Sequence, residues 1–286
     1  MSVLAGFTLL KRPNFRALFS YPFNINQLNN MITEILEPVA PQQPKRCNLL
    51  LHCGASAVTR GNLALSPTPQ ATSTWKPIPH MLLLQVIERA LLERGFVVVN
   101  QAHGLTHDDA RYFGLLEIAS NHADAEYRYV VGVRNSHDMR FSAGIVAGSQ
   151  VQVCDNLCFS GEIQLARKHT PRILQDLLRL AGDAVGGLKR YWDQHDMRVE
   201  RYQIAEINDA QAHDLIVRSV DQGVMANSYI PKVLSEWRHP SHREFEVKNV
   251  WSLQNAFTEV FKGRLDLLPD RTRRLHQLLD HEVGLN

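Results

Sequence analysis

The chain has 286 residues, of which 21% are charged and 44% hydrophobic, and its formal net charge is +2. Such a length is sufficient to bury a full core, and the glycine and proline content is that of an ordinary globular chain rather than a disordered or collagen-like one. The near balance of charge excludes a strongly acidic DNA mimic and does not by itself indicate a nucleic-acid partner. Composition therefore predicts a globular protein and leaves its function open.

Cysteine use and hydropathy indicate a cellular compartment. The four cysteines are Cys47, Cys53, Cys154 and Cys158. No segment before them combines basic, apolar and small residues in the order of a secretion signal, so we expect a reducing cytoplasm. The longest apolar runs, such as residues 81–84 and 96–99, are far shorter than the ~20 residues of a membrane helix. We expect a cytoplasmic protein without a membrane partner.

Residues 1–46 are predicted to form a basic N-terminal arm and linker. Residues 38–44 are rich in proline and glutamine, a composition typical of linkers. Before them, residues 25–36 carry apolar side chains at helical spacing. The α+β core is expected over residues 47–205, and a helical C-terminal subdomain over residues 206–286.

The core begins with an extended segment at residues 48–53 and a long polar segment at residues 59–76, which we interpret as a loop or flap. A helix should follow, because Met81, Leu84 and Ile87 recur at helical spacing and Gly95 provides a stop.

Successive strands with short turns predict an antiparallel meander. The strand candidates are residues 96–100, 111–119, 127–134, 141–154 with a break at Gly148-Ser149, and 162–167. Along residues 127–134 the tyrosines and valines alternate with Arg128 and Arg134, so one face of the sheet should be apolar while the other carries arginine.

A long helix is predicted over residues 171–194, because Thr170 is a good N-cap and Pro171 suits the first helical position. Its apolar stripe should lie across the sheet. Gly182, Gly186 and Gly187 should mark close backbone packing or a kink. Later helices are expected at residues 209–222, 229–237, 248–262 and 269–281. The fold class is therefore α+β, with an antiparallel β-meander packed against a long helix and a helical C-terminal part.

Metal and catalytic interpretations are both weak. The pairs His103 with His107 and His239 with His242, and Cys154 with Cys158 near His169, lack the paired context of a zinc motif. We therefore expect no stoichiometric zinc.

Ser136, His137 and Asp138 could supply a nucleophile and an acid/base pair. Adjacent residues on an extended chain point to opposite faces, so the three cannot all meet without a turn. A turn at residues 135–138 is the simpler interpretation. A metal-dependent nuclease would need clustered carboxylates, which the sequence does not show.

The sequence has neither a phosphate-binding loop nor a dinucleotide-binding glycine motif, so we expect no cofactor and no nucleotide hydrolysis. Basic and aromatic residues of the predicted strands and long helix could instead line one groove for single-stranded DNA, with arginines on phosphates and rings on bases. The alternative is a set of surface cations above a core of aromatic residues. The candidate nucleic-acid-binding residues are Arg128, Arg134, Arg140, Arg167, Lys168, Lys189, Arg190, Phe141 and Tyr191.

Several ordered motifs carry a family resemblance. They include residues 74–80 (TWKPIPH), 112–117 (YFGLLE), 132–138 (GVRNSHD), 154–162 (CDNLCFSGE), 237–240 (WRHP) and 255–263 (NAFTEVFKG). Together they resemble the phage/plasmid-like family of unknown function, over roughly residues 47–263. Cys158 departs from the small residue expected at its position. The resemblance implies a mobile-element setting and no catalytic residues.

A weaker resemblance is topological. A helix, an antiparallel meander and a long returning helix are similar to the core of single-strand annealing recombination proteins, and residues 184–190 resemble their basic helix segment. We therefore expect a non-catalytic protein that binds single-stranded DNA in recombination or replication. The alternative is an interaction protein acting on host defence or replication machinery, with a host or phage partner. A homo-oligomer is a further expectation.

Overall fold

The computed structural model describes Leu49 and residues 55–106, 108–119, 127–151, 157–163, 172–262 and 267–285, with only the backbone course given for 158–163. All of them belong to the second of two units, Met1–Gln43 and Pro44–Asn286. The predicted arm, linker and early helix lie outside the described residues, as do all but Leu49 of the predicted strand at 48–53. Thr170, Pro171, Arg167 and Lys168 also lie outside them. The predicted domain boundaries stay predictions.

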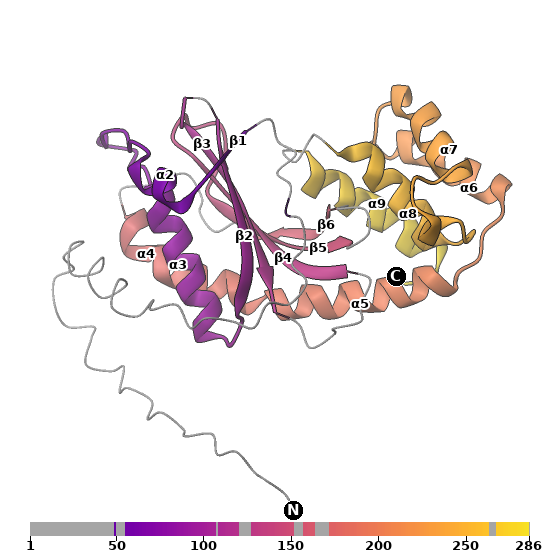
Figure 1. The fold of residues 1–286 in the computed structure, drawn as a ribbon, viewed down its shortest axis with the longest axis horizontal. Coiled ribbons are helices and arrows are strands. Elements are labelled where there is room, and N and C mark those ends of the chain that lie inside the picture. The colour runs from indigo at the N-terminus through magenta and orange to yellow at the C-terminus, as the bar shows by residue number, and fades with distance from the viewer. Residues whose placement is uncertain are drawn as a thin grey trace, which may run out of the picture. The chain divides into compact units, whose positions relative to one another are not determined.

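The described strands form one sheet in which every strand pairs antiparallel with its neighbours in chain order (Figure 1). The meander and the α+β class are thus confirmed. The strands are β1 (Ser56–Val58), β2 (Val98–Leu105), β3 (Arg111–Ile118), β4 (Tyr127–Ser136), β5 (Gly144–Val151) and β6 (Leu157–Ile163).

Two details of the sheet bear on the predicted strands. The break expected at Gly148-Ser149 is a register shift in the pairing with β6, between Ala147 and Gly148. The last described strand runs from Leu157 to Ile163 and so begins before the predicted start at residue 162.

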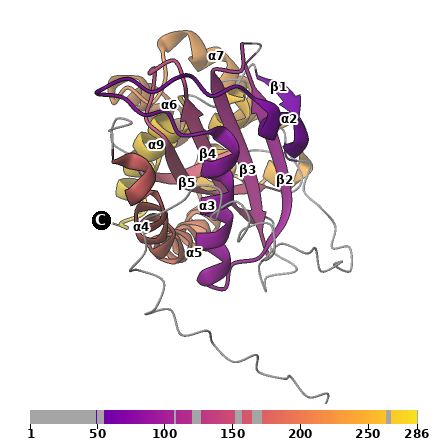
Figure 2. The ribbon, with the colours of Figure 1, turned by 90° about the vertical axis from the view of Figure 1, so that its left-hand side faces the viewer.

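Three helices cover one face of the sheet: α3 (His80–Glu93), α4 (Ile173–Gly186) and α5 (Leu188–Ile204). Val131 and Val133 of β4 pack into one cluster with these helices, and Figure 2 shows α3 lying across the strands. The predicted long helix is divided at Gly187, which confirms the kink. The Arg94 side chain lies against the helix at Gly186, where a Cβ atom would meet its guanidinium.

The predicted loop at residues 59–76 contains a short helix, α2 (Arg60–Leu65), which corrects the prediction. Thr59 and Asn62 form a capping box at its start, and this pairing satisfies backbone groups that would otherwise be exposed. Leu63 anchors the helix in the same cluster as α3.

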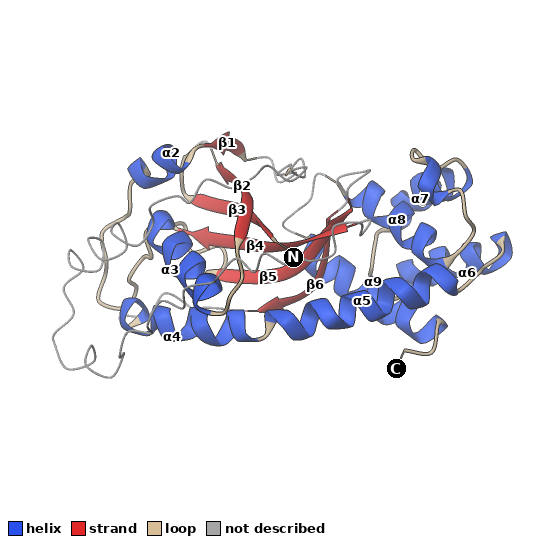
Figure 3. Cartoon of the chain, turned by 60° about the horizontal axis from the view of Figure 1, so that its bottom comes forward, coloured by secondary structure: helices blue, strands red, loops and turns tan. Residues whose placement is uncertain are grey.

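The C-terminal helices pack on the opposite face of the sheet. Val130, Phe113, Leu115 and Val146 share a cluster with them, so the face expected to carry arginine is also largely buried. The reason is that valine and leucine alternate onto this face along β3 and β5. Figure 3 shows that these helices gather near the end of α5 that is farther from α4. They are α6 (Asp209–Asp221), α7 (Ile230–Arg238), α8 (Val250–Phe261) and α9 (Leu268–Glu282).

The helical prediction for the last third of the chain is confirmed. Among the described residues, no helix has both the length and the hydrophobicity to cross a membrane.

Candidate nucleic-acid interface

The candidate cations divide between the two faces of the sheet. Val131 and Val133 face α3, α4 and α5, so Arg128 and Arg134, which alternate with them, lie on the face away from the long helix. Lys189 and Arg190 belong to α5 and are exposed. The sequence analysis predicted that these residues line one groove between the sheet and the long helix. The described candidates do not do so. They form separate groups.

One group lies where β4 ends and β5 begins. The guanidinium of Arg134 lies 5.3 Å from the centroid of the half-buried Phe141 ring. Phe141 in turn lies 5.5 Å from Phe113, which is the residue opposite Arg134 in the β3–β4 register. Arg140 is exposed beside them in the same loop. We call Arg111, Phe113, Arg134, Arg140 and Phe141 the arginine–phenylalanine corner.

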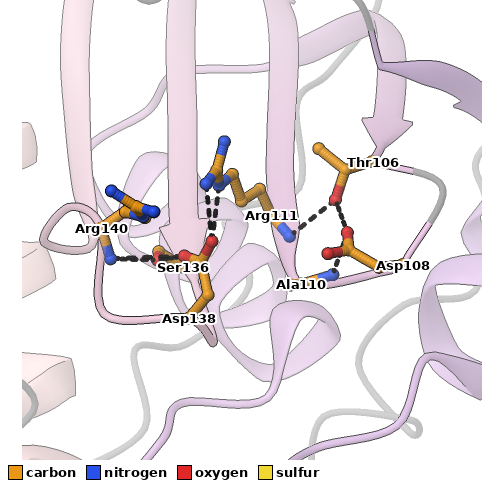
Figure 4. A network of polar contacts seen from close by, with 7 residues as sticks. All are labelled: Thr106, Asp108, Ala110, Arg111, Ser136, Asp138 and Arg140. Carbon is orange, nitrogen blue, oxygen red and sulfur yellow. Dashed lines mark hydrogen bonds and ion pairs between the residues drawn. The ribbon is translucent and has the colours of Figure 1, made fainter.

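A hydrogen-bond network fixes the edge of this corner (Figure 4). Arg111 Nε donates to Asp138 Oδ2 at 2.8 Å, and Ser136 Oγ donates to Asp138 Oδ1 at 2.5 Å. The backbone N–H of Arg140 donates to Ser136 Oγ at 3.1 Å. These contacts join two strand ends and the loop after β4, so Arg140 and Phe141 follow a braced backbone.

The neighbouring β2–β3 turn carries a smaller network. Thr106 donates its hydroxyl proton to Asp108, and the backbone N–H of Ala110 donates to the same carboxylate at 3.3 Å. Asp108 also lies close enough to Arg111 to raise the pKa of that guanidinium, after the larger effect of Asp138. The corner therefore combines three arginines with two nearby carboxylates.

Ionisation of the corner is insensitive to pH near neutrality. Partial burial raises the pKa of Asp138. Hydrogen bonds from Arg111, Ser136 and the Arg140 backbone lower this pKa by more than burial raises it, so the net pKa lies below its usual value. Asp138 therefore stays charged and paired to Arg111. Arg134 and Arg140 supply positive charge beside the Phe141 ring.

The second group is on α5. Lys189 Nζ lies 2.9 Å from both carboxylate oxygens of Asp193, one helical turn further on. The guanidinium of Arg190 lies 5.6 Å from the Tyr191 ring centroid, and Arg190 is exposed. Lys189 is thus paired within its own helix. Arg128 lies apart from both, half-buried on β4 opposite Gln150.

Comparison with known proteins places this chain in a family. Residues 70–281 match the model of a domain of unknown function, DUF932, and this match covers most of the chain, from before α3 into α9. The chain belongs to the DUF932 family. No curated protein and no solved structure matches it.

In this DUF932 chain the His137 side chain lies apart from those of Ser136 and Asp138, which are hydrogen-bonded to each other. The His137 ring is buried, stacks on His80 at a centroid distance of 3.8 Å, and donates from Nε2 to the Ile78 carbonyl at 2.9 Å. Ser136 and Asp138 belong to the network at the corner. Strand alternation thus separates His137 from the other two residues, so the three groups do not all meet, as the sequence analysis predicted. The turn itself begins at residue 137, after β4 has included Asn135 and Ser136.

The metal candidates fall partly outside the described residues, which exclude His107, Cys154 and His169. His103 is buried and bonded through Nδ1 to the Tyr112 hydroxyl at 2.9 Å. Within the part of the chain that the structure describes, no three His, Cys, Asp or Glu side chains are placed to hold a metal ion.

Sequence reasoning missed Arg111 and Phe113, two residues of the corner in this DUF932 structure, and also Met139, which lies next to the corner. Arg111 and Phe113 were read only as the start of a strand, although their spacing of two places them on one face. Their contacts depend on the pairing of Arg111 with Ser136 and Phe113 with Arg134, which follows from the hairpin register. Met139 was not considered, because the sequence gives no signal for its backbone conformation.

Proposed function

We propose that this DUF932 protein binds single-stranded DNA at the arginine–phenylalanine corner. The observation that carries the proposal is the Arg134 guanidinium held over the Phe141 ring, beside exposed Arg140. Arginine planes and aromatic rings are surfaces on which unpaired bases stack, while the charges of the arginines attract phosphates. The corner provides stacking surfaces and positive charge on β4 and on the loop that follows it.

The wider role that we propose is a non-catalytic accessory of recombination or annealing in a mobile genetic element, acting in the cytoplasm. The resemblance to phage/plasmid-like proteins supports the setting. The arrangement of α3, the meander and the returning helices α4 and α5 on one sheet face supports the analogy with annealing proteins, which is an analogy of topology alone.

Fluorescence anisotropy with a labelled single-stranded oligonucleotide, repeated over a range of salt concentrations, tests the proposal. Each phosphate contact on a single strand contributes about 0.7 to the slope of log affinity against log salt. The double variant R134A/R140A should therefore weaken binding and reduce the slope by roughly 1 to 1.5.

Two further double variants locate the interface. K189A/R190A removes the α5 group and should have the smaller effect, because these two residues lie outside the proposed site. K232A/R238A removes two exposed cations of α7 and is the matched control, since Lys232 also lies near a ring, 5.8 Å from the Tyr229 centroid. It should leave the slope unchanged. A reversed order of these effects would move the interface to α5.

Stacking is separable from charge. Replacement of Phe141 by alanine should weaken binding by about 1 to 3 kcal/mol and leave the salt slope nearly unchanged, because no charge is lost. Absence of binding by the unmodified protein at low salt, where electrostatic attraction is strongest, would overturn the DNA proposal.

A second candidate function is an interaction protein acting on host defence or replication machinery. It is favoured by two exposed apolar side chains on α5, Met197 at 55% and Ile204 at 71% exposure, seven positions apart and so on one helix face. A photo-crosslinking residue in place of Met197 should then capture one defined partner or a second copy of the chain. The same residue in place of exposed Arg179 on α4 should not.

A further inference from the structure

The loop between β4 and β5 presents one apolar side chain in an unfavourable backbone conformation. Met139 has φ 60° and is 66% exposed. Left-handed backbone is uncommon for residues other than glycine, asparagine and aspartate, and exposure of a long apolar side chain adds no core packing. Local structure and burial therefore both disfavour methionine here, and such outliers concentrate at functional sites.

The surrounding contacts hold this conformation in place. On one side of Met139, Asp138 accepts hydrogen bonds from Ser136 and Arg111, and on the other the Arg140 N–H donates to Asp138 Oδ1 at 3.3 Å. Below it, the His137 N–H donates to the Ala110 carbonyl at 2.7 Å. The loop is therefore a braced support for an exposed methionine.

Met139 directly precedes two residues of the arginine–phenylalanine corner, Arg140 and Phe141. A single strand bound at the corner would bring the end of any adjoining duplex next to the loop. Proteins that open or kink duplexes insert phenylalanine, leucine, isoleucine, methionine or proline against base steps. The thioether side chain is flexible and polarisable, and it packs well on aromatic surfaces.

We propose that Met139 is a wedge that stacks on the terminal base pair where single-stranded DNA meets a duplex. The preferred ligand of the DUF932 protein is then a junction of this kind rather than a free single strand. This inference rests on the proposed function, because the corner must hold the single-stranded part.

The experiment compares three fluorescent DNAs by anisotropy: a single strand, a blunt duplex, and a duplex with a tail of the same length as the single strand. The unmodified protein should bind the tailed duplex about tenfold more tightly than the single strand, the effect of one added stacking contact. M139G should lose this preference and bind the single strand within about twofold of the unmodified protein.

Two controls separate the side chain from the loop. M139L keeps a large apolar group and should retain the preference. D109G changes the other non-glycine residue with left-handed backbone among the described residues, in the neighbouring turn, and should also retain the preference. Thermal melting of each variant checks the fold, and M139G should melt no lower than the unmodified protein, because glycine fits the left-handed region without steric cost.

A base analogue provides a direct signal. 2-Aminopurine as the first unpaired base of the tail should brighten when the unmodified protein binds and stay dim with M139G, because Met139 would displace this base from the end of the duplex and unstacking raises its emission. Binding of single strands without any junction preference would overturn this inference and leave the proposed function intact. Absence of binding to all three DNAs would overturn both.

Discussion

Two turns at the same end of the sheet contain the non-glycine residues with positive φ among the described residues, yet they use that backbone differently. In the β2–β3 turn Asp109 has φ 54°, and its carbonyl accepts a hydrogen bond from buried His80 Nε2 at 3.0 Å. In the β4–β5 loop Met139 has φ 60° and a largely exposed side chain. Aspartate tolerates this conformation and methionine does not favour it. Packing against His80 explains the backbone of the first turn. For the second turn we propose that the exposed Met139 side chain is the reason for its backbone.

The supports of the two turns differ in chemistry. His80 is 2% exposed, and its Nδ1 accepts from the Asn135 amide at 2.9 Å while Nε2 donates to the Asp109 carbonyl. The β4–β5 loop is instead braced at the surface by the ion pair of Arg111 and Asp138. A buried support should therefore be costly to remove, and the ionic one at the surface should cost less.

The largest expected effect is at the buried support. H80A should lower the free energy of unfolding by about 3 kcal/mol, because it leaves a cavity and removes the partner of the Asp109 carbonyl. Urea denaturation measures this loss. H239A, which truncates an exposed histidine, is the control and should stay within about 0.5 kcal/mol of the unmodified protein. A similar small loss for H80A would mean that the β2–β3 turn does not depend on His80.

Mild acid should next affect a buried histidine of β2, the strand that leads into the first turn, more than the ion pair of the second turn. Burial, followed by the positive charge of Arg60, lowers the pKa of His103 on β2 to about 4. Below pH 6.5 the unfolded chain takes up a proton that folded His103 does not, so stability falls as the pH drops from 6.5 towards 4. At pH 5 this one group lowers stability by about 2 kcal/mol. Asp138, whose pKa is lowered, contributes stability that is lost only under more acidic conditions, as the pH falls through its folded pKa.

The pH dependence of unfolding in H103Q checks this assignment. Between pH 6.5 and 5 the free energy of unfolding of H103Q should change less steeply with pH than that of the unmodified protein. The difference in slope should correspond to about one bound proton. Equal slopes for the two proteins would assign the acid sensitivity to other buried groups, of which His195, with a pKa also lowered by burial to about 4, would be the first to examine.

Much of the frame that supports these turns could be predicted from the sequence. Alternation along residues 127–134 and the short turns are sufficient for the meander, and the spacing of Met81, Leu84 and Ile87 is sufficient for α3. Gly187 indicates the kink between α4 and α5. These features depend on local periodicity, which a single sequence contains.

The corner depends on information that is not local. The pairing of Arg111 with Ser136 is set by the β3–β4 register, and residues 120–126 between the strands give no turn type that fixes it. The sheet face that carries Arg128 and Arg134 is covered by the C-terminal helices, which follow much later in the chain. The left-handed conformation of Met139 opposes its residue preference, so propensity could not reveal it. Sequence reasoning therefore fails where the structure departs from local rules, and we propose function at that point.

A smaller effect is expected at the ionic support. D138N removes the charge that pairs with Arg111, and since both side chains are partly exposed the loss should be about 1 kcal/mol or less. Urea denaturation of D138N, R111Q and the double variant gives their coupling energy, which should be about 0.5 kcal/mol. High salt should reduce the coupling. Fully additive losses would show that Arg111 does not brace the loop through Asp138.

The smallest effect tests the comparison itself. Left-handed backbone costs an L-residue about 1 to 2 kcal/mol, and glycine loses about 0.5 to 1 kcal/mol through the greater freedom of its unfolded chain. M139G should therefore gain about 0.5 kcal/mol in stability, whereas D109G should gain nothing, because aspartate already tolerates the conformation. Parallel urea titrations of the two variants resolve this difference. A gain in M139G together with loss of junction preference would show that the loop gives up stability to present a side chain. Equal changes in both variants would mean that the two turns are strained alike, and the contrast on which the wedge assignment depends would disappear.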